Sequence, residues 1–197
     1  IYAGGGFITF GAKTRNYIAR LDNTSGRLDT NWNPNADGVV YSIVVNGGDV
    51  YAGGGFTTIG GQTRNHIAKL NNTDGSADLS WDANSNSTIF TLAVSGSDVY
   101  AGGNFTTIGG QTRNNIAKLN NTNGNADGSW NPNADNTVLK IVLSGSDVYA
   151  GGSFSSIGGQ TRNYAAKLNN TNGNADAGWN ANSDGIVTTL AVSGSDL

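Results

Sequence analysis

Few side chains in this sequence are of types that carry out covalent chemistry. Cysteine is absent, which excludes disulfides, thiolate metal sites and cysteine nucleophiles. His66 is the only histidine, and at steps of 49 residues from it stand Tyr17, Asn115 and Tyr164. A lone histidine without a cysteine or glutamate partner makes neither a catalytic triad nor a zinc site. We therefore predict no catalytic residue, no metal ligand and no cofactor, and we assign no ligand-binding residue.

Oxygen-bearing side chains at alternate positions form the pattern with which a calcium-binding loop begins. The pattern occurs as Asn33, Asn35 and Asp37; as Asp82, Asn84 and Asn86; as Asn131, Asn133 and Asp135; and as Asn180, Asn182 and Asp184. A complete loop also needs a bidentate acid about eleven residues after its first ligand. Glutamate is absent from the chain, and Val44 holds that place after the first set. We interpret these segments as turns rich in Asn and Asp, and predict that metal is dispensable.

The tripeptide Thr-Arg-Asn recurs in four connecting segments. Its copies are residues 14–16, 63–65, 112–114 and 161–163, with the arginines at Arg15, Arg64, Arg113 and Arg162. Arginines presented so uniformly suit recognition of a carboxylate or a sugar ring. Alternatively, the five donors of each guanidinium tie its segment to backbone carbonyls or to an aspartate. We favour this second role, because a loop repeated so faithfully needs a structural clamp.

Two other recurring features suit glycan chemistry but also suit the fold. Asn71, Asn120 and Asn169 begin the acceptor pattern for N-glycosylation, as does Asn23. Because they lie where tight turns are expected, we interpret them as turn residues. The tryptophans Trp32, Trp81, Trp130 and Trp179 would stack on sugars if exposed. One large aromatic side chain per unit is more typical of an anchor between sheets.

The spacing of these features shows that the chain is built from repeats. Tyr2, Tyr51, Tyr100 and Tyr149 step by 49 residues, and the tryptophans share that step. We divide the chain into repeats 1–49, 50–98, 99–147 and 148–196 of one domain that covers residues 1–197. A unit of this size cannot bury a core alone and must stack on its neighbours. Methionine is absent, which indicates a processed product, a fragment or part of a longer parent chain.

Each repeat is predicted to form four short antiparallel strands. In the first repeat these are residues 1–5, 17–21, 27–32 and 39–45, with 7–16 as a connection without strands. Paired glycines in the first strand predict a close approach by a neighbouring backbone or ring. In residues 39–45, Tyr41, Ile43 and Val45 share one face of the strand, which suits a sheet stacked between similar sheets. Four-stranded units of about 40–50 residues indicate an all-β propeller, whereas β-helix repeats are shorter.

The two ends of the chain predict how the structure closes. Residues 186–193 correspond to the last strand of a repeat, and residues 1–5 correspond to the strand that follows it. We expect these segments to pair and complete one composite four-stranded unit, which would remove two exposed sheet edges. The same segments would otherwise pair between two chains or continue into further repeats.

The repeat resembles a known family. Segments such as "IAKLNNTDGSADLSWD", together with "VYAGGGF" after a valine-rich strand, resemble the delta-sixty repeat propellers of bacterial secreted and surface proteins. The paired glycines are similar, more loosely, to those of kelch repeats. The resemblance implies a structural or interaction module without a shared catalytic activity.

Charge and composition narrow the class of partner. The net charge is -3, which disfavours nucleic acid and anionic membrane as partners, and no apolar run reaches the roughly 18 residues of a membrane span. Richness in Gly, Asn, Ser and Thr favours an exported or surface protein.

We predict a non-enzymatic extracellular or cell-surface scaffold or interaction module with a protein or glycan partner. The alternative is a multivalent carbohydrate-binding propeller with one weak site per repeat. An enzyme is disfavoured, since no repeat has paired acids or a nucleophile that the others lack.

Overall fold

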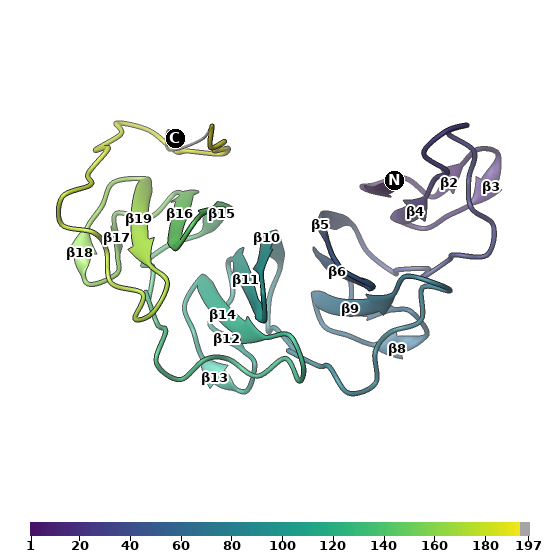
Figure 1. Cartoon of the computed structure of the whole chain (residues 1–197), viewed down its shortest axis with the longest axis horizontal. Coiled ribbons are helices and arrows are strands. Elements are labelled where there is room, and N and C mark those ends of the chain that lie inside the picture. Colours follow the sequence, from purple (N-terminus) through teal and green to yellow (C-terminus); the bar gives the residue numbers. More distant parts are fainter. Residues whose placement is uncertain (194–197) are drawn as a thin grey trace.

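The computed structural model describes residues 1–193, which form an open arc of small antiparallel sheets and contain no helix (Figure 1). Sheet I consists of β1 (Tyr2–Gly4) and β4 (Ile18–Arg20). Sheet II consists of β5 (Val40–Asn46), β6 (Asp49–Gly54) and β9 (Ile67–Asn71). Sheet III consists of β10 (Ile89–Ser95), β11 (Asp98–Gly103) and β14 (Ile116–Asn120). Sheet IV consists of β15 (Val138–Ser144), β16 (Asp147–Gly152) and β19 (Ala165–Asn169). The predicted all-β class and the repeated antiparallel strand groups are confirmed.

A small hairpin lies between the last two strands of each group. The hairpins are β2 (Thr9–Phe10) with β3 (Lys13–Thr14), β7 (Thr58–Ile59) with β8 (Gln62–Thr63), β12 (Thr107–Ile108) with β13 (Gln111–Thr112), and β17 (Ser156–Ile157) with β18 (Gln160–Thr161). The prediction that residues 7–16 contain no strand was therefore wrong. In the second hairpin Gly60 and Gly61 adopt φ values of 62° and 75°, which glycine tolerates and which allow the tight reversal.

The predicted outermost strand is reduced to a single bridge, so the sheets are three-stranded at most. Leu21 pairs with Leu28, and the equivalent bridges are Leu70 with Ala77, Leu119 with Ala126 and Leu168 with Ala175. The strand ends there because the next side chain accepts a hydrogen bond from the backbone two residues further on. The Asp78 carboxylate, for example, accepts the N–H of Ser80 at 2.9 Å. Such local turns compete with a sheet ladder.

A bulge interrupts the innermost strand of each complete sheet. In sheet III, Ile89 pairs with Gly103 and Thr91 with Gly102, which leaves Phe90 without a place in the ladder. Tyr41 and Leu139 occupy the same position in β5 and β15. The predicted alternation of faces therefore holds only after the bulge, since the extra residue shifts the register.

The hydrophobic cores lie between successive sheets. The core between sheets II and III combines Tyr51, Ile67 and Trp81 with Leu92 and Phe105, all of them buried. Two similar cores join sheet I to sheet II and sheet III to sheet IV. The paired glycines allow this approach, because a Cβ on Gly53 would lie 2.7 Å from Ile89 Cγ2. The sequence correctly predicted both the stacking of sheets and the close contact at the glycines.

The predicted pairing of residues 186–193 with residues 1–5 is not found. Residues 186–192 form no strand, and β1 pairs only with β4 among the described residues. The N–H of Val187 instead donates to the carbonyl of Gly152 in sheet IV at 3.2 Å. Sheet I and the C-terminal segment lie at the two ends of the open arc in Figure 1. The segment therefore packs on sheet IV. It does not meet β1, because the arc does not close and its two ends lie apart.

Candidate functional site

The recurring arginines act as clamps within the fold. The Arg64 side chain is 7% exposed and donates to the carbonyls of Thr63 and Asp78 at 2.8 and 2.9 Å. These bonds tie hairpin β7–β8 to the turn beyond β9. The equivalent arginines are Arg15, Arg113 and Arg162, each with a matching pair of carbonyl acceptors. Arg64 Nη1 also lies 3.9 Å from the Asp82 carboxylate, so its guanidinium is held by both kinds of acceptor that we expected of a clamp.

A lysine in each of sheets II to IV pairs with two aspartates, and the lysines of sheets II and III also contact the next sheet. Lys118 Nζ lies 3.6 Å from Asp98 and 2.9 Å from Asp127, and it donates to the carbonyl of Asn170 at 3.1 Å. Lys69 makes the same contacts in sheet II. Although burial acts to raise it, hydrogen bonds from Lys118 and Ser129 lower the pKa of Asp127 to about 2. The charge of Lys118 is thus paired within its own sheet, and its bond to the carbonyl of Asn170 links this sheet to the next.

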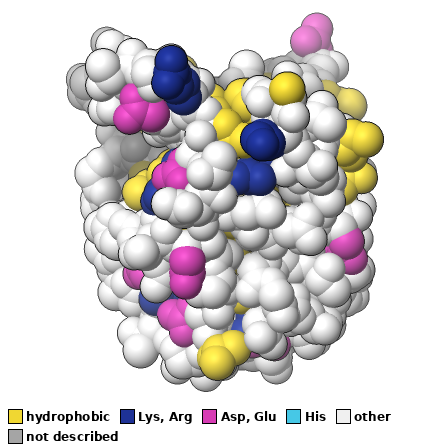
Figure 2. All heavy atoms as spheres, turned by 90° about the vertical axis from the view of Figure 1, so that its right-hand side faces the viewer, with side chains coloured by type: hydrophobic (Ala, Val, Ile, Leu, Met, Phe, Trp, Pro, Cys, Tyr) yellow, Lys and Arg dark blue, Asp and Glu magenta, His cyan; other side chains and the backbone are white. Residues whose placement is uncertain are grey.

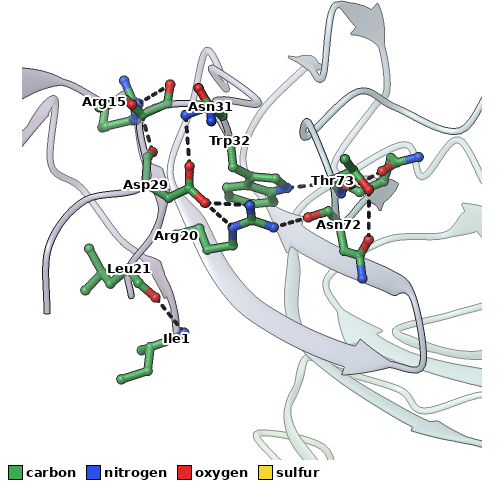
Figure 3. Close-up of polar contacts among 11 residues, drawn as sticks. Ile1, Arg15, Arg20, Leu21, Asp29, Asn31, Trp32, Asn72 and Thr73 are labelled. Atoms are coloured by element: carbon green, nitrogen blue, oxygen red, sulfur yellow. Dashed lines mark hydrogen bonds and ion pairs between the residues drawn. The ribbon is translucent and has the colours of Figure 1, made fainter. Parts of the chain in front are cut away.

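The tryptophan of each sheet connects it to the next one. The indole N–H of Trp32 donates to the carbonyl of Asn71 at 3.0 Å, beside the contact of Arg20 with Asn72 (Figure 3). Trp81 and Trp130 donate to the equivalent carbonyls at 2.9 Å, and all three indoles are fully buried. Each also meets a tyrosine edge-on, with ring centroids 5.0 to 5.6 Å apart. The prediction that these tryptophans anchor neighbouring sheets is confirmed for them.

The oxygen-rich loops are caps for the hairpin of the next repeat. The Asp37 carboxylate accepts the N–H groups of Thr57 and Thr58 at 2.7 and 2.9 Å. The amide oxygen of Asn35 accepts a bond from Asn16 at 2.8 Å. Asn86 and Asp135 cap the following hairpins in the same way. The side-chain oxygens of Asn35, Asp37, Asn86 and Asp135 are thus engaged by protein donors.

His66 and the Asn-Thr turns also have local roles. His66 adopts a φ of 65°, and Tyr17, Asn115 and Tyr164 share this left-handed conformation. Burial lowers the pKa of His66, so its ring is neutral near pH 7. The Asn71 side chain accepts the N–H of Thr73 at 2.7 Å, which closes the predicted turn.

Shallow clefts occur beside these contacts. One of about 210 Å³ lies at Asp49 and Asp78, and the corresponding cleft in sheet IV has about 260 Å³. A larger one of about 510 Å³ separates residues 131–133 from hairpin β17–β18. Asn131, Asn133, Gln160 and Asn174 contribute to its lining, so amide groups dominate its polar character.

The bulges present a row of apolar side chains that sequence reasoning missed. Tyr41 is 54% exposed and its ring lies 5.5 Å from that of Phe90 on the adjacent inner strand. Leu139 holds the same position on β15 and is partly exposed. The strands are in direct contact, since the N–H of Ile141 donates to the Thr91 hydroxyl at 3.1 Å. We call Tyr41, Phe90 and Leu139 the bulge row. The repeat alignment held only a weak signal for it, because the next position also varies, as Ser42, Thr91 and Lys140.

The described part of the chain shows no metal cluster or membrane helix. Within residues 1–193, no three His, Cys, Asp or Glu side chains are grouped so as to hold a metal ion. None of these residues belongs to a helix long and apolar enough to cross a membrane.

The comparisons with known proteins agree with this architecture. The model of a β-propeller domain of unknown function, DUF5122, matches residues 1–31, 48–80, 98–129 and 147–178, more than half of the chain. The chain belongs to this family. The expected membership of a bacterial repeat propeller family is confirmed. No curated protein matches the sequence.

Two designed proteins resemble this DUF5122 propeller in structure. The crystal structure of the computationally designed Ika8 protein matches with a TM-score of 0.55 and 11% identity, over 80% of this chain and 41% of that chain. This propeller therefore spans about two fifths of the length of Ika8. The designed Ika4 protein matches with a TM-score of 0.47 and 11% identity, over 71% of each chain. At this identity the likeness to Ika8 concerns the fold alone.

The four matched segments of the DUF5122 propeller contain the arginine clamps. Each segment ends one residue before a tryptophan, so Trp32, Trp81, Trp130 and Trp179 lie just outside the family match. The capping loops and the inner strands β5, β10 and β15 also lie outside it. The bulge row therefore belongs to the part of the repeat that the family pattern does not specify.

Proposed function

We propose that this chain is a non-enzymatic interaction module that works outside the cell or on its surface. The observation that carries the proposal is the bulge row, in which a constant framework presents a different side chain at the same position of successive repeats. The recurring polar side chains support it too. Arg64, Lys69, Trp81 and Asp37 all bond to other parts of the fold, which leaves the variable positions to provide recognition.

The partner that best fits the bulge row is a protein segment with apolar side chains. Tyr41 and Phe90 supply adjacent aromatic surface, and aromatic residues are enriched where proteins bind tightly. The net charge of -3 does not favour an anionic partner.

Selection from a random peptide library tests this proposal. We expect enriched peptides to carry apolar residues and to bind the Tyr41→Ser/Phe90→Ser double variant at least about tenfold more weakly, a loss of about 1.4 kcal/mol. Leu79→Ser is the matched control, because Leu79 is 75% exposed and lies away from the row. Peptides that bind the double variant as well as they bind the parent chain would refute the assignment of the row.

Carbohydrate binding is the second candidate, favoured by the amide-rich cleft beside hairpin β17–β18. Amide groups can donate to and accept from sugar hydroxyls in the same site. A glycan array probed with the parent chain and with the Asn131→Ala/Asn174→Ala variant distinguishes the candidates. Specific glycan signals that this variant loses would favour a lectin-like role. A blank array together with peptide binding at the row would favour the first proposal.

A further inference from the structure

Asn46 is the last residue of β5 and is followed directly by Gly47. The dipeptide Asn-Gly occurs at three places in the chain, which are residues 46–47, 123–124 and 172–173. In each place a β-branched residue precedes the asparagine, namely Val45, Thr122 and Thr171. Because the local sequences are so similar, a difference in reactivity between the three asparagines must come from the folded structure.

The backbone N–H of Gly47 is free and open to solvent. Asn46 pairs with Asp49 in the ladder, which leaves Gly47 and Gly48 as the two central residues of the turn between β5 and β6. Gly47 adopts a φ of 60°, as the first central residue of a type II′ turn does. Its N–H donates no hydrogen bond within residues 1–193. Gly47 is exposed, and a Cβ placed on it would meet no atom within 4 Å.

The glycines of the other two Asn-Gly dipeptides are closed off. The N–H of Gly124 donates to the carbonyl of Asn120 at 2.9 Å, and the N–H of Gly173 donates to the carbonyl of Asn169 at 2.9 Å. Both glycines are buried. A Cβ on Gly124 would lie only 2.9 Å from the backbone nitrogen of Ala83, which shows how closely the preceding loop packs on it. These two N–H groups become available only when their turns open locally.

The side chain of Asn46 links sheet II to sheet III. Its Nδ2 donates to the carbonyl of Gly96, in the turn between β10 and β11, at 3.1 Å. Asn121 Nδ2 donates to the same carbonyl at 3.4 Å. Serine holds the position of Asn46 in the later repeats, as Ser95, Ser144 and Ser193. Because a serine side chain has no carbonyl carbon, only the repeat with Asn46 can form a cyclic imide at this position.

We propose that Asn46 is a site of spontaneous deamidation, and that this reaction loosens the contact between sheets II and III. A hydroxide ion from the solvent removes the N–H proton of Gly47. The backbone nitrogen then attacks Cγ of Asn46, and the side-chain nitrogen takes up a proton from water and leaves as ammonia. The cyclic imide consumes one water molecule and opens to aspartate or isoaspartate. Attack within the chain is favoured because the reacting groups are held close together. The proposal does not rest on the bulge row.

The product changes both contacts of residue 46. A carboxylate there has no N–H to donate to the carbonyl of Gly96, and it repels that oxygen. It also lies opposite Asp49 in the ladder, and like charges directly opposite each other destabilise an antiparallel pair. Charged side chains are sparse on the face of the molecule seen in Figure 2, most of which is uncharged. Since the reaction makes the net charge of -3 more negative, ion exchange separates the product from the parent chain.

Peptide mapping by mass spectrometry tests the proposal on the folded chain in mildly alkaline buffer. The deamidation rate at each Asn-Gly is divided by the rate at the same site in urea, where the local structure is lost. We expect this ratio to be at least about fivefold larger at Asn46 than at Asn123 or Asn172, because one hydrogen bond lowers the population of free N–H groups by about that factor. A ratio at Asn46 that does not exceed the other two would overturn the proposal.

Two variants of residue 46 test the site and its consequence. Asn46→Ser introduces the side chain of the later repeats, so it should keep the fold and lose the first acidic species that the parent chain forms during ion exchange. Asn46→Asp copies one product of the reaction and should melt about 1–4 °C below Asn46→Ser, the shift that opposed like charges give in a chain of this length. Equal melting temperatures would overturn the loosening of the contact. An acidic species that forms equally fast in Asn46→Ser would overturn the assignment of the site.

Discussion

Replacement of Arg64 by alanine is the most direct test of how the repeats are held together. The substitution removes bonds to two carbonyls, of Thr63 at 2.8 Å and of Asp78 at 2.9 Å, from a side chain only 7% exposed. A buried acceptor left unsatisfied costs about 1–3 kcal/mol. Water reaching the vacated space restores part of this loss, so we expect a net destabilisation of about 1–3 kcal/mol. In a chain of 150–250 residues, each kcal/mol corresponds to about 2–4 °C in Tm.

Two matched variants make the measurement interpretable. Arg64→Lys keeps the charge but not the planar fork that reaches both carbonyls, so it should fall between the parent chain and Arg64→Ala. Arg27→Ala removes an exposed arginine in a turn and should change stability by less than about 0.5 kcal/mol. Urea unfolding followed by tryptophan fluorescence gives the three values. If Arg64→Ala is as stable as Arg27→Ala, the clamp interpretation is wrong.

Three further predictions concern the tryptophans, the acidic clusters and the capping loops. Trp81→Phe should lower the free energy of unfolding by about 1–3 kcal/mol, since the buried carbonyl of Asn120 loses its donor. Trp179→Phe should lower it by less than about 1 kcal/mol in dilute, monomeric samples. Equal urea midpoints for the two variants would contradict this prediction. The folded-state pKa of Asp127 is about 2 and lies below its unfolded value of about 3.9. The stability that ionised Asp127 contributes is therefore present above the unfolded pKa and is lost as the pH falls from about 5 to 2. Asp127→Asn should therefore flatten the acid dependence of Tm by the equivalent of up to about 2 kcal/mol, and an unchanged acid profile would count against the cluster. Melting temperatures in millimolar calcium and in excess chelator should agree, because protein donors occupy the Asp37 carboxylate; a shift of many degrees would show a native-state site.

Local chemistry allowed much of this fold to be predicted from the sequence. The turn residues, the alternating apolar strands and the paired glycines each depend on neighbours within a few positions. Gly26, for instance, adopts a φ of 66°, which glycine tolerates in a turn. The tryptophan anchors and the arginine clamps followed from repetition, because side chains kept in every repeat must serve the contact that every repeat makes.

The apolar pattern of the sequence did not predict where the strands are interrupted. At these places other hydrogen bonds compete with the sheet ladder. The outer strand stops at one bridge, since the Asp78 carboxylate captures the N–H of Ser80 before a ladder can continue. The bulge at Phe90 also lies inside an apparently regular apolar run. The position of this extra residue depends on how β10 pairs with β11. The apolar periodicity of the sequence does not reveal it.

What the sequence by itself determined is the repeat and the residue types at each face; what only the tertiary structure decided is which faces meet. The step of 49 residues places a donor group and an acceptor carbonyl in every repeat. Whether Trp179 finds its acceptor depends on the angle through which each sheet turns relative to the last. That angle is set by the packing of side chains such as Leu92 and Phe105 between sheets, and small rotations add along the arc. The chain therefore specifies three similar contacts locally, while the open arc emerges only from their sum.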